Sequence, residues 1–203
     1  YRDWRELVHA AEVDAVCIGT WPNLHCPVTL EALAAGKHVL TEARMAASLS
    51  DAERMCAAAA AAGDRVAMVV PAPLYLEHEP ALLRLLAEGF FGAWLEIHLR
   101  GMGGAYDPAA PLHWRQRRDL SGDNVLSLGI LNETVRRYAG DERAVVAHAS
   151  IFTPRRRDPD SGEWLPVDVP DSLGVVAEMS CGATAVYHLS NAARHGAASA
   201  LEF

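Results

Sequence analysis

Two hydrophobic periodicities alternate along the first 70 residues of the chain. Short apolar runs of strand length occur at 14–20, 38–41 and 66–70, and stretches with helical spacing of apolar residues precede or separate them at 4–11, 27–35 and 52–62. Gly36 and Gly63 follow two of these helical stretches, where glycine commonly ends a helix. The order strand, helix, strand, helix, strand predicts a parallel sheet with right-handed crossovers.

The pattern changes after residue 73. Later segments combine helical stretches with strand-like runs separated by turn residues: helices are expected at 80–89 and 122–138, and strands at 92–100, 145–152, 174–180 and 183–190. Consecutive antiparallel strands beside helices are typical of an α+β domain with one large sheet. We therefore expect domains at 1–72 and 73–203, with a boundary near residues 71–73. The charged, proline-rich segment 154–170 is expected to be a surface excursion.

Composition excludes several classes of protein. The 203 residues are 51% hydrophobic, which excludes general intrinsic disorder, and their net charge of 18 − 26 = −8 argues against nucleic acid as the main partner. No apolar run approaches the length of a membrane span, and no leader is visible, so no membrane partner is expected.

The four cysteines carry no metal or disulfide signature. Cys17, Cys26, Cys56 and Cys181 form no C-x-x-C pair, and no Cys/His spacing suits zinc, so no metal is predicted. Cys17 lies in an apolar run and Cys56 in an alanine-rich helix, and both are expected to pack as small hydrophobic side chains. Reduced thiols favour a cytoplasmic protein.

Candidate chemistry follows the first two predicted strands. Ligands of open parallel sheets bind beyond the carboxyl ends of the strands, and neighbouring strands would bring the loops 19–25 and 41–46 into one crevice. The candidate binding residues there are Thr20, Trp21, His25, Glu42 and Arg44. A structural role is the alternative for several of them, since Trp21 could simply pack, His25 could cap the next helix and Glu42 could be solvated.

Taken together, these segments resemble the Gfo/Idh/MocA oxidoreductases. Residues 14–46 (DAVCIGTWPNLHCPVTLEALAAGKHVLTEARMA) resemble the signature of that family, which ends in a motif built around EKP. Weaker similarity continues in LLRLLAEGFFGAWLEIHLRG and HWRQRRDLSGDNVLSLGILNETVRRYAG. The resemblance implies the fold class: α/β, with the second half of a Rossmann parallel sheet followed by an α+β domain with a large, mainly antiparallel open sheet.

The resemblance also implies a function. Family members bind NAD or NADP in the Rossmann domain and use the second domain for substrate contacts and oligomerisation, so a homo-oligomer through the second-domain sheet is expected. They move a hydride between nicotinamide C4 and a hydroxyl-bearing carbon of a sugar, cyclitol or small diol. Thr20, His25 and Glu42 match family positions near the nicotinamide.

Three departures from the family pattern affect proton transfer. Ala43 stands where the family has its catalytic lysine, Ser127 where it has an aspartate and Leu131 where it has a histidine, although Gly129 between the last two is retained. Alanine and leucine cannot exchange protons. These losses support an alternative function, a non-catalytic pseudo-oxidoreductase that binds cofactor or sugar.

Other residues are candidates to replace the lost groups. Glu133 and His113 are the catalytic candidates, and Trp114, Arg115 and Asp123 are the candidate substrate contacts. Arg44 could hold a carboxylate or phosphate, but arginine is a poor proton acceptor. The carboxylates could instead be solvated, and the residues around Trp114 could form a plain packing cluster. The basic runs 115–118 and 155–157 are interpreted as solvated faces.

No G-x-G-x-x-G sequence occurs among the 203 residues. In a Rossmann fold this loop cradles the pyrophosphate at a helix N-terminus. We therefore expect these residues to be part of a longer chain, and to bind a dinucleotide weakly or not at all by themselves.

Overall fold

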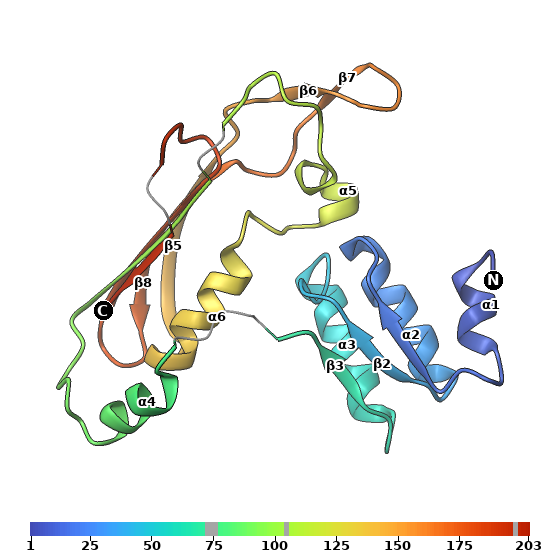
Figure 1. Ribbon diagram of the computed structural model, residues 1–203, viewed down its shortest axis with the longest axis horizontal. Helices are drawn as coiled ribbons and strands as arrows, with labels where there is room; N and C mark the ends of the chain where they lie inside the picture. Colours follow the sequence, from blue (N-terminus) through green and yellow to red (C-terminus); the bar gives the residue numbers. More distant parts are fainter. Residues whose placement is uncertain (72–76, 104–105, 197–198) are drawn as a thin grey trace. The chain divides into compact units, whose positions relative to one another are not determined.

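The computed structural model describes residues 1–71, 77–103, 106–196 and 199–203 (Figure 1). They form two compact units: Tyr1–Pro71 with Arg117–Asn124, and Ala72–Gln116 with Val125–Phe203. The predicted boundary near residues 71–73 falls partly on residues 72–76, which lie outside the described ranges.

The first unit is built on a three-stranded parallel sheet. The strands β1 (Ala15–Ile18), β2 (His38–Thr41) and β3 (Ala67–Val69) lie side by side in that order. The helices α1 (Trp4–His9), α2 (His25–Ala34) and α3 (Leu49–Ala61) share one hydrophobic core with the sheet. Ser48 caps α3 by accepting the Asp51 N–H, and Gly36 and Gly63 take left-handed conformations just after α2 and α3.

The alternation of side chains along β1 determines that Cys17 is exposed. Val16 and Val39 face the helices and are buried, whereas Cys17 and Leu40 alternate onto the opposite face and are exposed. Cys56 is also exposed, on α3. The expectation that Cys17 and Cys56 pack inside was wrong, because an apolar sequence does not reveal which face of a strand or helix meets the core.

The second unit holds a five-stranded sheet with the order β10-β4-β9-β8-β5. Its β4 and β9 run parallel and its other neighbours antiparallel. The strands are β4 (Glu96–Met102), β5 (Glu142–Ser150), β8 (Ser172–Met179), β9 (Thr184–Ser190) and β10 (Ala200–Glu202). The helix α6 (Leu128–Ala139) covers one face through Val135 and Ala139, and α4 (Glu79–Ala87) belongs to the same unit. The predicted fold class is confirmed.

Two predicted segments differ from the structure. The expected helix over 122–138 begins only at residue 128, as α6, and a separate short helix, α5 (Arg118–Ser121), precedes it and ends before Gly122. The segment 154–170 contains a hairpin of β6 (Arg155–Arg157) and β7 (Trp164–Pro166), and it is not wholly a surface excursion. Within it, Arg156 is buried because β6 turns alternate side chains inward, and Val167 and Val169, which follow β7, are also buried.

Residues 117–124 pack with the first unit, whereas the sequence assigned them to the second domain. The Asp123 N–H donates to the carbonyl oxygen of Ala47 at 2.8 Å, and the Asn124 amide donates to that of Ala46 at 3.2 Å. These bonds attach the segment to the loop that follows β2. Hydrophobic periodicity could not show them, since each ends on a backbone carbonyl.

A buried tyrosine–carboxylate pair in the second unit gives a first prediction. The Tyr187 hydroxyl, on a side chain only 2% exposed, donates to Glu142 Oε1 at 2.9 Å. Burial and this bond raise the pKa of Tyr187, so the hydroxyl stays a donor. Tyr187→Phe is expected to lower the free energy of unfolding by about 1.5–3 kcal/mol in urea titrations, because the carboxylate loses a charge-assisted bond.

Tyr1→Phe is the matched control for this prediction. The Tyr1 hydroxyl also donates to a glutamate, Glu12, but the tyrosine is 69% exposed. Water replaces the lost bond there, so the change is expected to stay within about 0.5 kcal/mol. Equal losses in the two variants would show that burial of the Tyr187 pair contributes nothing.

Candidate functional site

The loops that follow β1 and β2 adjoin at one edge of the first unit's sheet. The Glu42 N–H donates to the Ile18 carbonyl oxygen at 3.0 Å, which joins the two loops directly. Thr20 and Glu42 are exposed, and Trp21 is 48% exposed. A methyl group built on Gly19 would meet no atom within 4 Å, so the space beside this strand end is open. The two loops therefore adjoin as predicted, with the side chains of Thr20, Trp21 and Glu42 accessible beside open space.

His25 lies beneath these loops. Its side chain is 1% exposed, with Nδ1 2.8 Å from the Arg44 carbonyl oxygen and Nε2 3.0 Å from the Thr20 carbonyl oxygen. The imidazole thereby holds the loop after β1 against the loop after β2. The contacts that the structure shows for His25 are therefore with the two loops, so it has a positioning role there, whereas the sequence named it a cofactor contact.

Segment 117–124 forms a further wall of the same site. Arg44 Nη1 donates to Ser121 Oγ at 3.2 Å, and Ser121 is fully buried. Asp123, a predicted substrate contact, is exposed and pairs with Arg118 at 2.5 Å. Ser121 is not among the site residues predicted from the sequence. The adjacent Gly122 is the one local sign of a turn at this position.

The predicted aromatic and cationic cluster is present in the second unit. The Arg115 guanidinium lies over the Trp114 ring at 4.1 Å, and the His113 and Trp114 ring centroids are 5.6 Å apart. The Gln116 side chain accepts the His113 N–H at 3.0 Å. These contacts fix a short turn on which the imidazole faces a polar cavity.

That cavity has a volume of about 290 Å³ and lies within the second unit. Its walls come from the segment after β4, from β6 and from the end of β9. The lining residues are Gly103, Tyr106, Asp107, Ala110, Pro111, His113, Gln116, Arg156 and Asn191. His113 is the only predicted site residue among them. Arg156 is not among the site residues predicted from the sequence. Alternation along a strand over 155–157 would have placed its side chain on the opposite face from those of Arg155 and Arg157.

The other catalytic candidate lies elsewhere in this unit. Glu133 stands on α6, with its side chain 64% exposed and 3.8 Å from Arg136 in an i,i+3 pair. It does not line the cavity of His113. Leu131, at the family's histidine position, packs against the hydrophobic core beside β4. The structure therefore brings His113 together with Trp114 and Arg115, but leaves Glu133 on a solvated helix face.

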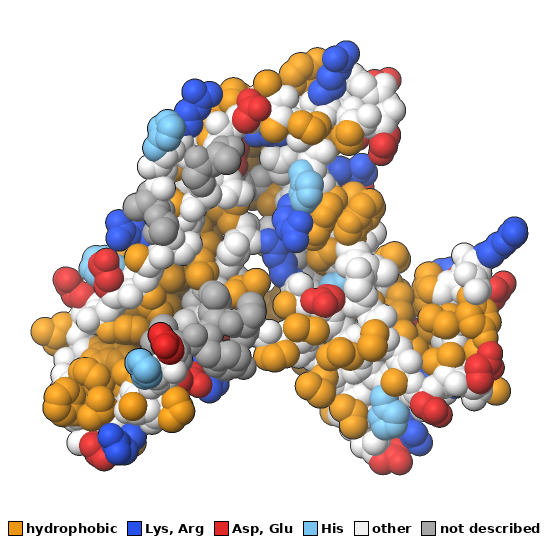
Figure 2. All heavy atoms as spheres, viewed as in Figure 1, with side chains coloured by type: hydrophobic (Ala, Val, Ile, Leu, Met, Phe, Trp, Pro, Cys, Tyr) orange, Lys and Arg blue, Asp and Glu red, His pale blue; other side chains and the backbone are white. Residues whose placement is uncertain are grey.

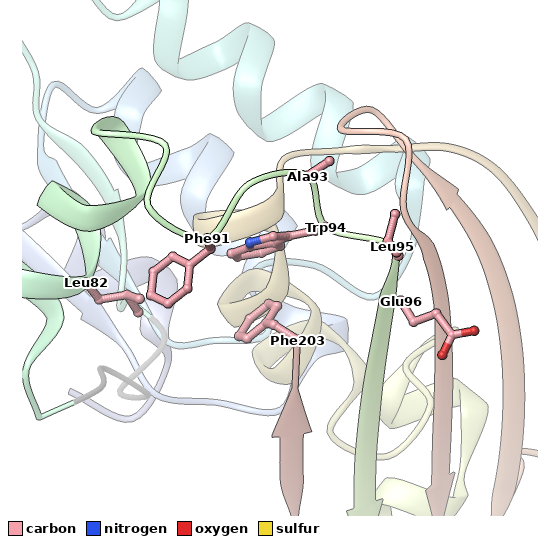
Figure 3. Close-up of a pocket in the computed structure, with 7 residues that line it drawn as sticks. All are labelled: Leu82, Phe91, Ala93, Trp94, Leu95, Glu96 and Phe203. Carbon is pink, nitrogen blue, oxygen red and sulfur yellow. The ribbon is translucent and has the colours of Figure 1, made fainter.

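A larger cavity of about 550 Å³ is apolar. Its lining residues are Leu82, Phe91, Ala93, Trp94, Leu95, Glu96 and Phe203 (Figure 3). The rings of Trp94 and Phe203 lie against each other with centroids 4.4 Å apart and a tilt of 42°, and Glu96 points away from the rings in Figure 3. Hydrophobic side chains gather around the α4 end of this unit in Figure 2. With no polar group directed inward, this cavity is unsuited to polyol chemistry.

The described parts of the chain show neither a group of metal-ligating side chains nor a helix suited to cross a membrane. Residues 1–71, 77–103, 106–196 and 199–203 contain no group of three potential metal-ligating side chains. Within the same ranges, no helix has the length and apolarity needed to cross a membrane.

The environment of His113 predicts a titration shift. Burial, and then the positive charge of Arg115, lower the pKa of His113 below its ordinary value of 6.5. The unfolded chain takes up this proton first as pH falls, so the contribution of His113 to stability is lost below pH 6.5. NMR titration of the ring should give a midpoint under 6.5.

Arg115→Gln is the control for this titration. It should raise the midpoint only in part, because burial, the larger cause, remains. A midpoint at or above 6.5 in the unaltered protein would contradict the assigned environment.

Comparison with known proteins places the first unit most directly. Residues 1–70 match the model of the Gfo/Idh/MocA family, described as an oxidoreductase family with an NAD-binding Rossmann fold. A 1,5-anhydro-D-fructose reductase of Ensifer adhaerens is 36% identical over 124 residues, which cover 60% of this chain and 35% of that protein.

Solved structures match both units. An NAD-binding oxidoreductase from Klebsiella pneumoniae is 30% identical with a TM-score of 0.80, over 95% of this chain and 52% of that one. A levoglucosan dehydrogenase in complex with NADH and levoglucosan is 25% identical with a TM-score of 0.82, over 99% of this chain and 54% of that one. The chain spans about half the length of these solved relatives.

Proposed function

The chain belongs to the Gfo/Idh/MocA family of NAD-binding oxidoreductases, and we propose that the protein transfers a hydride between a nicotinamide dinucleotide and a hydroxyl-bearing carbon of a sugar or cyclitol. One observation carries the proposal: the loops after β1 and β2 adjoin at the carboxyl ends of the strands and expose Thr20 and Glu42. Ligands of open parallel sheets bind at this edge. Two of the three relatives named above, the 1,5-anhydro-D-fructose reductase and the levoglucosan dehydrogenase, are named for a small sugar derivative.

The residues present fit one part of the cofactor. Thr20 and Glu42 offer a hydroxyl and a carboxylate beside the open space at Gly19, which suits the polar groups of a nicotinamide ribose. Bound NAD would accept or supply the hydride. The chain contains no G-x-G-x-x-G loop, so these residues serve the nicotinamide side of the site and not the pyrophosphate.

Proton transfer needs a group other than the family's lysine, because Ala43 cannot exchange a proton. His113 is the candidate general base. Its lowered pKa keeps the ring neutral near pH 7, and it lines a polar cavity beside Trp114 and Arg115. A neutral imidazole accepts a hydroxyl proton as the hydride leaves, and returns it in the reverse direction.

Steady-state assays of the complete gene product test this function. NAD and NADP are supplied with levoglucosan, inositols and anhydro-sugars, and NADH and NADPH with the corresponding ketones. Turnover with at least one pair is expected, and His113→Ala should lower kcat by about 10²–10⁴-fold. His9→Ala, which alters an exposed imidazole on α1, should leave kcat unchanged.

The outcomes of this assay separate the two candidate functions. Absence of turnover with every pair, together with binding of NADH, would favour the non-catalytic alternative that Ala43, Ser127 and Leu131 suggest. Turnover that survives His113→Ala would keep the reaction class and remove His113 from it. Glu133→Gln would then be the next variant, because Glu133 is the remaining carboxylate candidate on α6.

We also propose a homo-oligomer through the large sheet. On the face opposite α6, Val146, Val176 and Val186 form one row across β5, β8 and β9 and are 76%, 51% and 36% exposed. A row of uncovered valines suits burial against a second copy. Sedimentation should show an oligomer that Val176→Arg dissociates, while Leu49→Arg on α3 does not; a monomer in the unaltered protein would overturn this proposal.

A further inference from the structure

The cavity beside β6 contains a buried cation that the proposed reaction does not use. Arg156 is the middle residue of three consecutive arginines and is 5% exposed, in a hairpin region whose surface shows both basic and acidic side chains (Figure 2). Its neighbours are exposed and donate to backbone carbonyls of the same hairpin, Arg155 to Trp164 and Arg157 to Gly162. The expectation that 155–157 is a solvated face was therefore wrong for Arg156, whose side chain turns inward and lines the cavity.

One edge of the Arg156 guanidinium is occupied. Nη1 donates to the carbonyl oxygens of Asp107 at 2.9 Å and Ala110 at 2.8 Å. These two bonds fix the plane of the guanidinium against the segment after β4. They do not neutralise its charge, because both acceptors are uncharged carbonyls.

The opposite edge has no partner among the described residues. Nε is buried without a hydrogen bond, and within the described ranges Nη2 forms no bond and no carboxylate pairs with the side chain. Asp107 lines the same cavity, but its carboxylate accepts the Ala109 N–H at 2.8 Å. Nε and Nη2 form the pair of donors that a carboxylate or phosphate group engages with two parallel bonds. A guanidinium withdrawn from water with this edge unoccupied is costly, and an anion would offset the cost.

The rest of the cavity suits a polyol. The Tyr106 hydroxyl, which is 2.8 Å from Thr153 Oγ1, and the amides of Gln116 and Asn191 provide donors and acceptors around the volume of about 290 Å³. This volume lies at the lower end of small-molecule sites, so it accommodates one sugar ring and not a dinucleotide.

We propose that this cavity binds a monosaccharide that carries an anionic group, with Arg156 engaging the carboxylate or phosphate and Gln116 and Asn191 engaging hydroxyls. The identification of this ligand as the substrate rests on the proposed hydride transfer. The binding itself does not, because every residue involved lies in the second unit and none is a cofactor contact.

Calorimetric titration without cofactor tests the binding. The probes are glucuronate, glucose 6-phosphate, glucose and inorganic phosphate. One of the two charged sugars is expected to bind at least about 30-fold more tightly than glucose, in line with a charge-assisted bidentate bond. Preference for glucuronate assigns the group as a carboxylate, and preference for glucose 6-phosphate or free phosphate assigns it as a phosphate.

Three variants separate recognition from folding. Arg156→Gln should remove the preference over glucose, and Arg155→Gln, on the exposed neighbour, should leave it intact. Asp107→Asn keeps an oxygen acceptor for the Ala109 N–H but removes a negative charge, so it should tighten binding of the charged sugar several-fold. This last variant retains Arg156 and gives a gain of binding, which a misfolded protein would not show.

The results that overturn the proposal are equally specific. Equal affinity for charged and neutral sugars would do so, as would an unchanged preference in Arg156→Gln or weaker binding of the anion in Asp107→Asn. If a charged sugar binds but no sugar is turned over, the proposed anionic-sugar site is supported and the proposed hydride transfer is contradicted. If neutral sugars are turned over but no charged sugar binds, the hydride transfer is supported and the anionic-sugar site is contradicted.

Discussion

Replacing Gly122 with alanine is expected to detach segment 117–124 from the first unit. Gly122 has a φ of +71°, and an added Cβ would lie 2.0 Å from the carbonyl oxygen and 2.4 Å from Cα of Ala47. Both are backbone atoms and cannot rotate away. The substitution therefore combines the cost of a left-handed alanine with the loss of the bonds from Asp123 and Asn124 to the loop after β2.

The expected loss is about 3 kcal/mol in the free energy of unfolding of the first unit, summed from the left-handed backbone and two or three hydrogen bonds. Urea titration followed by circular dichroism measures it, and hydrogen exchange at the Asp123 amide should accelerate. Gly63→Ala is the matched control, because Gly63 has a φ of +66° but open space at its Cβ. It should cost only about 1 kcal/mol, and equal losses would exclude the clash with Ala47 as the cause.

His25→Ala is expected to separate the loops after β1 and β2. The change opens a cavity at a side chain that is 1% exposed and removes the ring N–H that, according to the tautomer, donates to the carbonyl oxygen of Thr20 or of Arg44. A lost buried ring and one lost hydrogen bond to a buried carbonyl oxygen together should lower the free energy of unfolding by about 3–4 kcal/mol. The complete gene product should also bind NADH more weakly, because Thr20 lies on the displaced loop.

His9→Ala serves as the control for this substitution. The His9 ring is 2.7 Å from Glu31, but its side chain is 58% exposed, so an effect within about 0.5 kcal/mol is expected. A loss in His25→Ala as small as that in His9→Ala would show that the loops are held by other contacts.

Local patterns predicted the elements of the first unit well. The strand His38–Thr41 is predicted at its observed bounds, and Gly36 and Gly63 follow helices as predicted. These features depend on residues close in sequence: a run of β-branched and apolar side chains, and a glycine after a helix. That the loops after β1 and β2 adjoin could also be predicted, since parallel neighbours bring their carboxyl ends together.

The roles of individual site residues could not be predicted in the same way. His25 was expected to touch cofactor, but two carbonyl oxygens, one of them 19 residues away in sequence, enclose its ring. Leu131 was noted only as a lost histidine, whereas its side chain packs beside β4. Whether a polar side chain contacts a ligand or its own backbone depends on contacts that sequence spacing does not contain.

The sequence by itself determined the fold class, the succession of strands and helices along the first unit and the adjacency of the loops after β1 and β2, because hydrophobic periodicity and motif spacing act over short stretches of chain. Only the tertiary structure decided that residues 117–124 complete the first unit, and that Arg156 lies buried while Arg155 and Arg157 are exposed. The physical reason is the same in both cases. Backbone carbonyls of distant segments, at Ala46, Ala47, Asp107 and Ala110, accept the deciding hydrogen bonds, and every residue type presents the same carbonyl.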